Sequence, residues 1–160
     1  MKKYKPTTPS RRQSTTVHYA KIVTTQNPEK SLTWGFKRKV GRNHHGRVTT
    51  RHKGGGHKRL FRAVDFVYDK IDIPYTIKTV EYDPNRSGFI GLAVYRDGEK
   101  RYVLLPKDAK VGDTFVVSEK APITPGNRLM LKNITVGTFV YNVEVKPRGG
   151  AKLGRSAGNY

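Results

Sequence analysis

The segment that most constrains this chain is residues 41–62, which read GRNHHGRVTTRHKGGGHKRLFR. It holds four of the five histidines, five glycines and seven Lys or Arg, and it contains no acid. Such a segment cannot enter a core, because an unpaired charge taken out of water costs several kcal/mol. Its repelling charges and flexible glycines also disfavour independent folding. Arg, Lys and a closely approaching Gly backbone suit a chain of phosphates, so nucleic acid is the first hypothesis and a solvated basic tail is the alternative.

The net charge of the 160 residues is +20, with a pI near 10.4, and it is unevenly distributed. Residues 1–62 hold 17 Lys or Arg against one acid, residues 63–142 hold 11 against 10, and residues 143–160 hold four against one. A basic arm therefore precedes a nearly neutral body. This balance indicates a nucleic-acid partner, or less often an anionic membrane surface.

Several classes of protein are disfavoured by what the sequence lacks. Without cysteine there are no disulfides, iron–sulfur clusters or Cys-ligated zinc sites, and the redox compartment is left open. The start, MKKYKPTTPSRRQ, has cations without a following apolar run, so we expect no secretory signal. No run of about 18 apolar residues predicts a membrane span. We expect an intracellular, soluble chain with no membrane partner.

From residue 60 the sequence changes to short runs rich in Val, Ile, Tyr and Phe. Four of these runs predict β-strands: LFRAVDFVYD, YTIKTVEYD, GFIGLAVYRD and KRYVLLP. Residues 114–118 and 128–131 predict further short strands, and Asp97-Gly98 predicts a hairpin turn. No segment has the sustained apolar period of a capped helix, so we expect a mainly β protein with little helix. This many short strands predicts a small Greek-key barrel, of which the OB-fold is the commonest nucleic-acid-binding version.

The regions before and after the expected barrel form separate segments of the chain. Residues 1–13 should be extended or disordered alone, and residues 15–24 have the composition of an edge strand. After Asn133, the run ITVGTFVYNVEVKP predicts two strands that begin a second β unit, which two strands cannot complete. We therefore expect a longer relative or a partner to supply its remainder. The predicted domains are a basic N-terminal extension (1–59), an OB-fold RNA-binding barrel (60–131) and the start of an incomplete domain (132–160).

The only Trp lies in the basic arm, in the run SLTWGFKRKV. Trp34 and Phe36 flank Gly35 and precede three consecutive cations. Aromatic rings interleaved with cations suit stacking on nucleic-acid bases. They equally suit anchoring the arm to a small core, and the sequence leaves both interpretations open.

Three glycines and two arginines stand out as candidate RNA contacts. Residues 54–56 remove three side chains in a row between cationic and His-containing triplets, which favours close backbone approach over a flexible linker. Arg86, in EYDPNRSG, and Arg155, in LGRSAG, are expected to project from turns for bidentate phosphate contact, with a surface Arg of no role as the alternative. The predicted RNA-binding residues are Arg42, His44, His45, Arg47, Arg51, His52, Lys53, Gly54, Gly55, Gly56, His57, Lys58, Arg59, Arg86 and Arg155.

Catalysis is not expected. The run GRNHHGRV resembles a phosphate loop, but Arg47 and Val48 stand where Lys and Ser/Thr are needed. The four clustered histidines have irregular spacing, no acid beside them and cations on every side, so we predict no metal and no cofactor. Their imidazoles are better suited to stacking on RNA or hydrogen-bonding to it. The acids of residues 65–83 are interpreted as ion pairs and turn caps, and a metal- or nucleotide-dependent enzyme is the least favoured hypothesis.

Long stretches resemble one family, the universal large-ribosomal-subunit protein two. They are GRNHHGRVTTRHKGGGHKRLFRAVDF, VEYDPNRSGFIGLAVYRDGEKRYVLLPK, PGNRLMLKNITVGTFVYNVEVKP and GGAKLGRSAGNY, in the family's order. The resemblance implies an OB-fold barrel followed by the beginning of an SH3-like barrel. It also implies direct binding of large-subunit rRNA, with the basic arm threading between RNA helices beside neighbouring ribosomal proteins. Family roles are subunit joining, tRNA binding and integrity of the peptidyl-transfer centre.

The family normally continues beyond RSAG with a basic extension, so we expect tRNA and small-subunit contacts of that extension to lie outside this sequence. The stretch TTRHKGGGHKR resembles the sequences of bacterial or organellar members, which implies a ribosome in the bacterial cytoplasm or an organellar matrix. The alternative function is a free OB-fold single-stranded RNA binder or RNA chaperone. That alternative needs exposed stacking rings on the barrel, for which Tyr68, Tyr75, Tyr82 and Tyr95 are the candidates.

Overall fold

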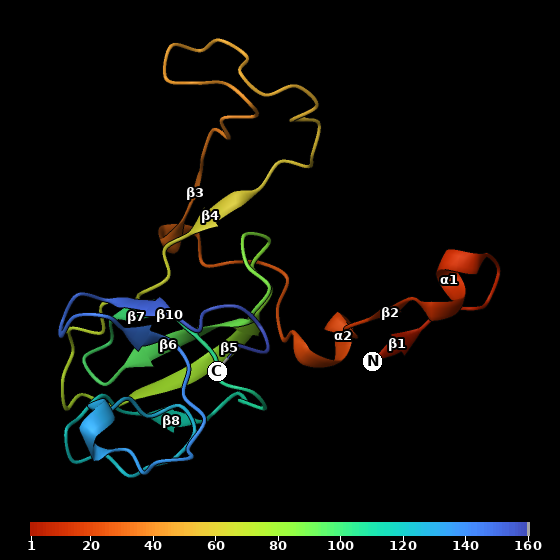
Figure 1. Ribbon diagram of the computed structural model, residues 1–160. Coiled ribbons are helices and arrows are strands. Elements are labelled where there is room, and N and C mark those ends of the chain that lie inside the picture. Colours follow the sequence, from red (N-terminus) through yellow and green to blue (C-terminus); the bar gives the residue numbers. More distant parts are fainter. Residues whose placement is uncertain (160) are drawn as a thin grey trace.

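The computed structural model describes residues 1–159 and shows a mainly β protein, with 25% of residues in strands and 9% in helices (Figure 1). The predicted fold class is therefore confirmed at this level. The body is a curled half-barrel sheet of the OB-like kind. A short stalk carries a loop away from this body, and the N-terminal residues extend to one side of it (Figure 1).

The central sheet has four antiparallel strands in the order β7-β6-β5-β8. These are β5 (Tyr75–Glu81), β6 (Ile90–Tyr95), β7 (Lys100–Leu104) and β8 (Thr114–Phe115). The hairpin predicted between β6 and β7 is confirmed, and Gly98 adopts a φ of 85° in its turn. β5 shifts register between Ile77 and Thr79, and such a bulge increases the twist that curls the sheet.

The core lies on the concave side of this sheet. It consists of Tyr68, Tyr75, Ile77, Val80, Ala93, Tyr95, Val103 and Phe115. Burial raises the pKa of Tyr95 to about 12, and it raises the pKa of Tyr68 and Tyr75 as well. Three of the four tyrosines considered as base-stacking candidates are therefore core residues, while Tyr82 is 47% exposed.

The run LFRAVDFVYD was predicted as one strand, and this was wrong beyond its third residue. Only β4 (Leu60–Arg62) is a strand, and Val64 makes a single parallel bridge to Tyr102. The Asp65 side chain then accepts hydrogen bonds from the amides of Val67 and Tyr68, and this turn ends the extended run. The turn brings the Tyr68 ring into the core.

The N-terminal region also differs from expectation. It contains β1 (Lys2–Lys3), α1 (Pro9–Gln13), β2 (Thr15–Thr16), α2 (Tyr19–Ile22) and the 3-10 turn η1 (Lys30–Leu32). Residues 15–24 add no edge strand to the barrel, because β2 pairs with β1 and the following residues form a helical turn. Thr24 nevertheless reaches the barrel, where its hydroxyl and amide both bond to the backbone of Val80.

The C-terminal strands agree with the prediction only in part, since one of the two lies inside the predicted run of residues 134–147. Residues 128–131 form no strand: Arg128 makes one bridge to Val117, and Leu131–Asn133 is the 3-10 turn η2. Residues 134–142 are loop, and the pair that forms is β9 (Val143–Glu144) with β10 (Ala151–Leu153). The Ala151 amide donates to the Phe66 carbonyl at 2.7 Å, so β10 docks on the body through a contact distant in sequence.

In the described part of the chain, no helix has the length and apolarity that crossing a membrane requires.

Candidate nucleic-acid interface

A two-stranded stalk presents the predicted RNA-binding segment. β3 (Thr33–Gly35) pairs antiparallel with β4, and residues 36–59 form the loop between them, which we call the basic lobe (Figure 1). The stalk joins the body where the Ala63 amide donates to the Leu32 carbonyl at 2.9 Å. It therefore holds 13 of the 15 predicted RNA-binding residues together, away from the barrel.

The basic lobe is organised by backbone turns and polar side chains, without an apolar core of its own. The Asn43 side chain accepts hydrogen bonds from the amides of His45 and Arg47, both at 3.0 Å, and closes one turn. The Gly41 carbonyl accepts bonds from the amides of Thr49 and Thr50, closing a second. Such a lobe keeps its cationic side chains exposed to solvent.

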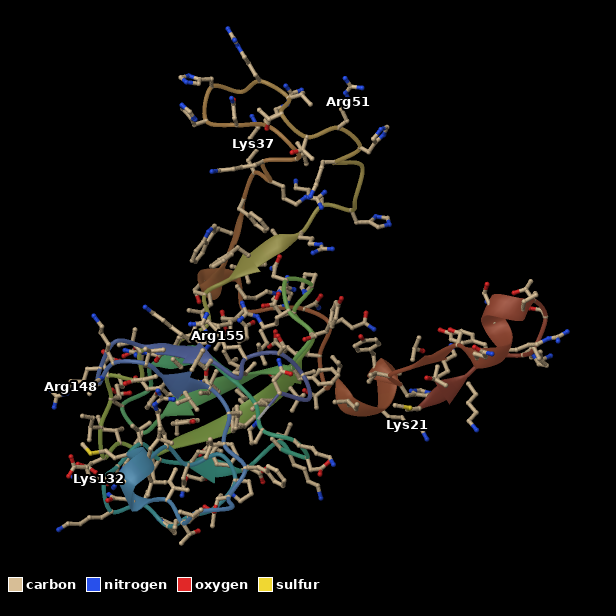
Figure 2. All side chains as sticks on the ribbon, viewed as in Figure 1. Lys21, Lys37, Arg51, Lys132, Arg148 and Arg155 are labelled. Carbon is tan, nitrogen blue, oxygen red and sulfur yellow. The ribbon has the colours of Figure 1, made fainter. Side chains whose placement is uncertain are left out.

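The cations of the lobe have no acid to pair with. No Asp or Glu occurs from Lys30 to Val64. Across residues 1–159, no Lys or Arg of the lobe makes an ion pair. Figure 2 shows Lys37 and Arg51 extending from the lobe, far from the body's Lys132. The lobe is thus a concentrated positive charge that only an external anion can neutralise.

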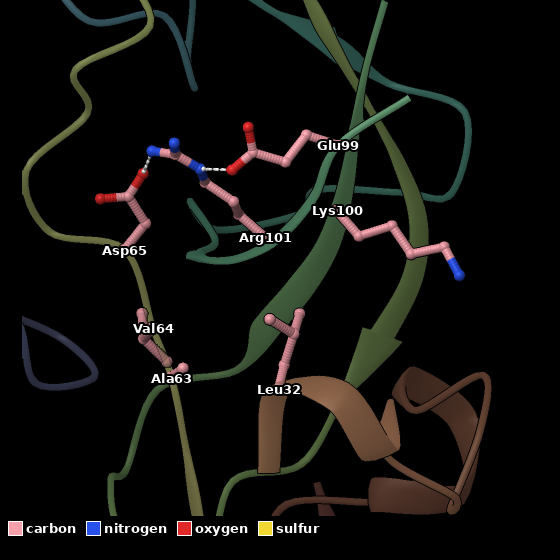
Figure 3. A pocket seen from close by; sticks show the side chains of 7 residues that line it. All are labelled: Leu32, Ala63, Val64, Asp65, Glu99, Lys100 and Arg101. Carbon is pink, nitrogen blue, oxygen red and sulfur yellow. Dashed lines mark hydrogen bonds and ion pairs between the residues drawn. The ribbon is translucent and has the colours of Figure 1, made fainter. Parts of the chain in front are cut away.

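Within residues 1–159, by contrast, five of the 11 Lys and Arg of residues 63–142 form ion pairs: Lys70, Arg86, Lys100, Arg101 and Arg128. Arg101 donates to Asp65 at 2.8 Å and to Glu99 at 2.5 Å (Figure 3). It also contacts Asp69. The Arg101 hydrogen bonds lower the pKa of Asp69 and of Glu99, and a Lys70 hydrogen bond lowers that of Asp97. The 11 Lys and Arg of residues 63–142 are nearly balanced by 10 acids, so the body attracts a polyanion less than the lobe does.

A hollow of about 330 Å³ lies beside these ion pairs at the base of the stalk (Figure 3). Leu32, Ala63 and Val64 line one side, and the Asp65–Arg101–Glu99 group lines the other. Asp65 and Glu99 are bonded to Arg101, and the remaining ionisable side chain of the lining, Lys100, pairs with Glu29. Of the acids of residues 65–83, the predicted ion pairing is confirmed for Asp65, Asp69 and Asp83, whereas Glu81 accepts hydrogen bonds from Tyr102 and Thr79.

The histidines of the lobe lie apart from any acid. The His44 and His45 rings are 3.7 Å apart at an angle of 46°, while His52 and His57 lie farther along the loop. In the described residues, no group of three or more His, Cys, Asp or Glu gathers as metal ligands do. All four histidine side chains are exposed.

The glycine triplet leaves its backbone open. Gly54 has a φ of 132° and Gly55 a φ of 69°, conformations that side chains disfavour. Around Gly55 there is open space on the side where a Cβ would stand, and the Gly56 carbonyl accepts a 2.7 Å hydrogen bond from Arg38. An approaching ligand atom can therefore reach the main chain at Gly55 directly.

Arg86 and Arg155 lie on the body, outside the lobe, and neither projects as expected. Arg86 Nε donates to the fully buried Asp83 at 2.6 Å, leaving the Arg86 side chain 18% exposed. Arg155 donates to the Ala151 carbonyl. Both guanidinium groups lie on Phe66, with Cζ to ring-centre distances of 5.5 Å and 4.0 Å. The expectation failed because the buried carboxylate and the aromatic ring attract the guanidinium groups inward.

Sequence reasoning left several interface residues out of the predicted set. Lys37, Arg38 and Lys39 belong to the lobe as much as the predicted cations do, and their run in the sequence was a sufficient signal. The pairing of Trp34 with Phe61 across the stalk had no local signal, because the two residues are distant in sequence.

The OB-like sheet and the uncompensated basic lobe define a nucleic-acid-binding protein. Residues 29–118, more than half of the chain, match the family described as Ribosomal Proteins L2, RNA binding N-terminal domain. The chain belongs to this family. It is a ribosomal protein of the large subunit that binds rRNA, and the family is one of structural RNA-binding proteins rather than enzymes. The match includes the stalk, the basic lobe and the four-stranded sheet, and it ends before η2.

Proposed function

We propose that the chain is a structural constituent of the large subunit whose basic lobe threads between helices of folded large-subunit rRNA. Through this contact it supports subunit association, tRNA binding and integrity of the peptidyl-transfer centre, next to neighbouring ribosomal proteins. The observation that carries the proposal is the exposed lobe of unpaired cations on a stalk. Because the major groove of A-form RNA is too narrow for side chains, recognition rests on phosphates and folded shape.

In this proposal the residues of the lobe have two roles. Its Lys and Arg side chains neutralise phosphates, and its histidines stack on RNA or hydrogen-bond to it. The open main chain at residues 54–56 lets a phosphate come close to backbone N–H groups. The proposed contacts in the lobe are Arg42, His44, His45, Arg47, Arg51, His52, Lys53, Gly54, Gly55, Gly56, His57, Lys58 and Arg59.

Arg86 and Arg155 contribute from the body in a more restricted way. Within residues 1–159, Arg86 uses only Nε in hydrogen bonds and Arg155 uses only Nη2. Their remaining outer nitrogens supply phosphate contacts at the rim around Phe66. The Asp83 and Phe66 contacts hold both guanidinium groups in place before RNA binds, which reduces the ordering entropy lost on binding.

In this proposal the chain has three segments with different roles. Residues 1–59 extend between RNA helices, residues 60–131 form the RNA-binding barrel, and residues 132–160 begin an SH3-like unit. Observed contacts join the first two segments through β3 and β4 and the last two through Phe66 and Ala151. The stretch TTRHKGGGHKR supports a bacterial ribosome, or an organellar one, as the location.

The test is binding of the chain to folded large-subunit rRNA and to unfolded single strands over a salt series. Arg51→Gln combined with Lys53→Gln should lower affinity for all sequences and reduce the slope of log K against log salt by about 1–2. The matched control, Lys120→Gln with Lys132→Gln, removes two exposed charges from the body and should leave the slope unchanged. Equal effects of both pairs would show that the charge acts diffusely and would refute the lobe as the interface.

The alternative, a free single-stranded RNA binder, predicts equal affinity for unfolded strands. The burial of Tyr68, Tyr75 and Tyr95 supports the ribosomal proposal over this alternative, because buried rings cannot stack on bases.

A further inference from the structure

The stalk carries an aromatic face that the electrostatic argument does not use. Trp34 and Phe61 are directly opposite each other in the β3–β4 pair, with ring centres 4.8 Å apart. Phe36 follows Trp34 by two residues, so it points to the same face, and its ring meets Phe61 edge-on at 6.0 Å. Trp34, Phe36 and Phe61 therefore form one cluster, which we call the stalk aromatic face.

This face is not part of the protein's core. Neither of the two buried hydrophobic clusters includes any of the three residues. Trp34 is 50% exposed and Phe36 is 40% exposed, although each is large and apolar. An isolated two-stranded ribbon is only marginally stable in water. The rings therefore hold the ribbon together and still leave apolar area for an occupant.

The charges around the face indicate what that occupant is. Lys37, Arg38 and Lys39 continue from the Phe36 strand, and Lys58 and Arg59 lead into the Phe61 strand. With no acid from Lys30 to Val64, these cations disfavour an apolar protein surface, which would desolvate them without compensation. A nucleotide combines a flat apolar base with an adjacent phosphate, and so matches rings bordered by cations.

A second half-exposed ring on the protein lacks this setting. Tyr82 is 47% exposed and packs edge-on against Tyr19 with ring centres 5.1 Å apart. However, no Lys or Arg adjoins it in the sequence: it stands between Glu81 and Asp83, whose carboxylates are buried and bonded to Tyr102 and Arg86. Exposure and ring contact are thus similar at Trp34 and Tyr82, while the charge differs.

We propose that the stalk aromatic face is a stacking site for one unpaired nucleobase of rRNA. This inference rests on the proposed function, in which RNA surrounds the lobe. It adds that the RNA beside the stalk has a bulged or looped-out base and is not continuous duplex. Trp34 stacks on the base, Phe61 supports the indole from behind, and Lys37 and Arg59 bind the flanking phosphates.

Trp34 is the only Trp in the chain, so its intrinsic fluorescence reports on this site alone. The full chain is titrated with an RNA hairpin that has one bulged base and with a fully paired hairpin of equal length. Binding is measured separately by the anisotropy of a dye on each RNA. We expect the bulged hairpin to quench Trp34 emission at saturation, and the paired hairpin and inorganic polyphosphate to bind without quenching.

Substitutions give an independent measurement. Trp34→Ala should weaken binding of the bulged hairpin by about 5- to 150-fold, the range for loss of one base–aromatic stack, and should leave the paired hairpin nearly unaffected. Trp34→Phe keeps a ring and should lose less than Trp34→Ala. The matched control, Tyr82→Ala, should change neither affinity.

The outcomes separate this inference from the proposed function. If neither hairpin binds, the proposed function fails and the inference fails with it. If both bind without quenching, or if Trp34→Ala weakens both equally, RNA binding stands and the stacking site is refuted. In that case the three rings only stabilise the two-stranded stalk or contact a neighbouring protein. If circular dichroism shows that the Trp34→Ala variant is unfolded, the quenching of the wild-type chain and the affinity of the Trp34→Phe variant still test the stacking site.

Discussion

Replacing Tyr102 by Phe removes a single hydroxyl that joins the N-terminal arm to the sheet. Tyr102 is fully buried, and its hydroxyl donates to the buried Glu81 carboxylate at 2.7 Å. The same oxygen accepts a hydrogen bond from the Glu29 amide, also at 2.7 Å. Tyr102→Phe therefore leaves one carboxylate oxygen and one amide without a partner, while the ring itself still fits.

The size of the effect follows from these two bonds. A hydrogen bond to a charged group contributes about 1.5–3 kcal/mol and a neutral one about 0.5–1.5 kcal/mol. We therefore expect Tyr102→Phe to lower the free energy of unfolding by about 2–4 kcal/mol. For a chain of this size, that corresponds to a Tm lower by about 4–16 °C. The Glu29 amide should also exchange its hydrogen faster, because the arm loses its attachment there.

A matched control is available in the same sheet. Tyr95 is equally buried, but within residues 1–159 its hydroxyl has no hydrogen-bond partner. Removing that hydroxyl relieves an unsatisfied polar atom, so Tyr95→Phe should be neutral or slightly stabilising. Urea unfolding followed by circular dichroism compares the two variants. Similar unfolding midpoints for Tyr102→Phe and Tyr95→Phe would refute the reasoning, because the chemical change is the same and only the partners differ.

Two further predictions concern the barrel. Gly126→Ala should destabilise the chain by about 1–3 kcal/mol in urea unfolding, because the new Cβ meets the Phe115 ring and φ is +100°. Gly137→Ala, where φ is +92° but the space is open, should lower the free energy of unfolding by less. The reverse order of the two variants would contradict the packing argument. Lys70 lowers the pKa of Asp97 below its ordinary 3.8, so the stability from this pair is complete above that value and is lost as pH falls through the lower folded pKa. Lys70→Met should make the free energy of unfolding depend less steeply on pH in the acid range. An unchanged dependence would contradict the pairing of Lys70 with Asp97.

Part of the fold followed from local patterns. The three long strands β5, β6 and β7 were predicted because their runs are rich in Val, Ile, Tyr and Phe and the Asp97-Gly98 turn closes the hairpin between β6 and β7. Strands that depend on distant partners were missed. β10 lies in a Gly-rich basic run, where it pairs with β9, and its Ala151 amide also donates to the distant Phe66 carbonyl. Residues 134–142 have strand composition but meet no partner strand, so they remain loop.

The sequence by itself determined where the charge is and therefore the class of partner. The imbalance between the lobe and the body is a sum over residues, and folding cannot change it. Tertiary structure decided how individual side chains are used. It turned Arg86 toward Asp83, placed Phe66 between distant arginines, and paired Trp34 with Phe61. Charge and turn chemistry are local properties, whereas burial and pairing depend on contacts between residues far apart in the chain.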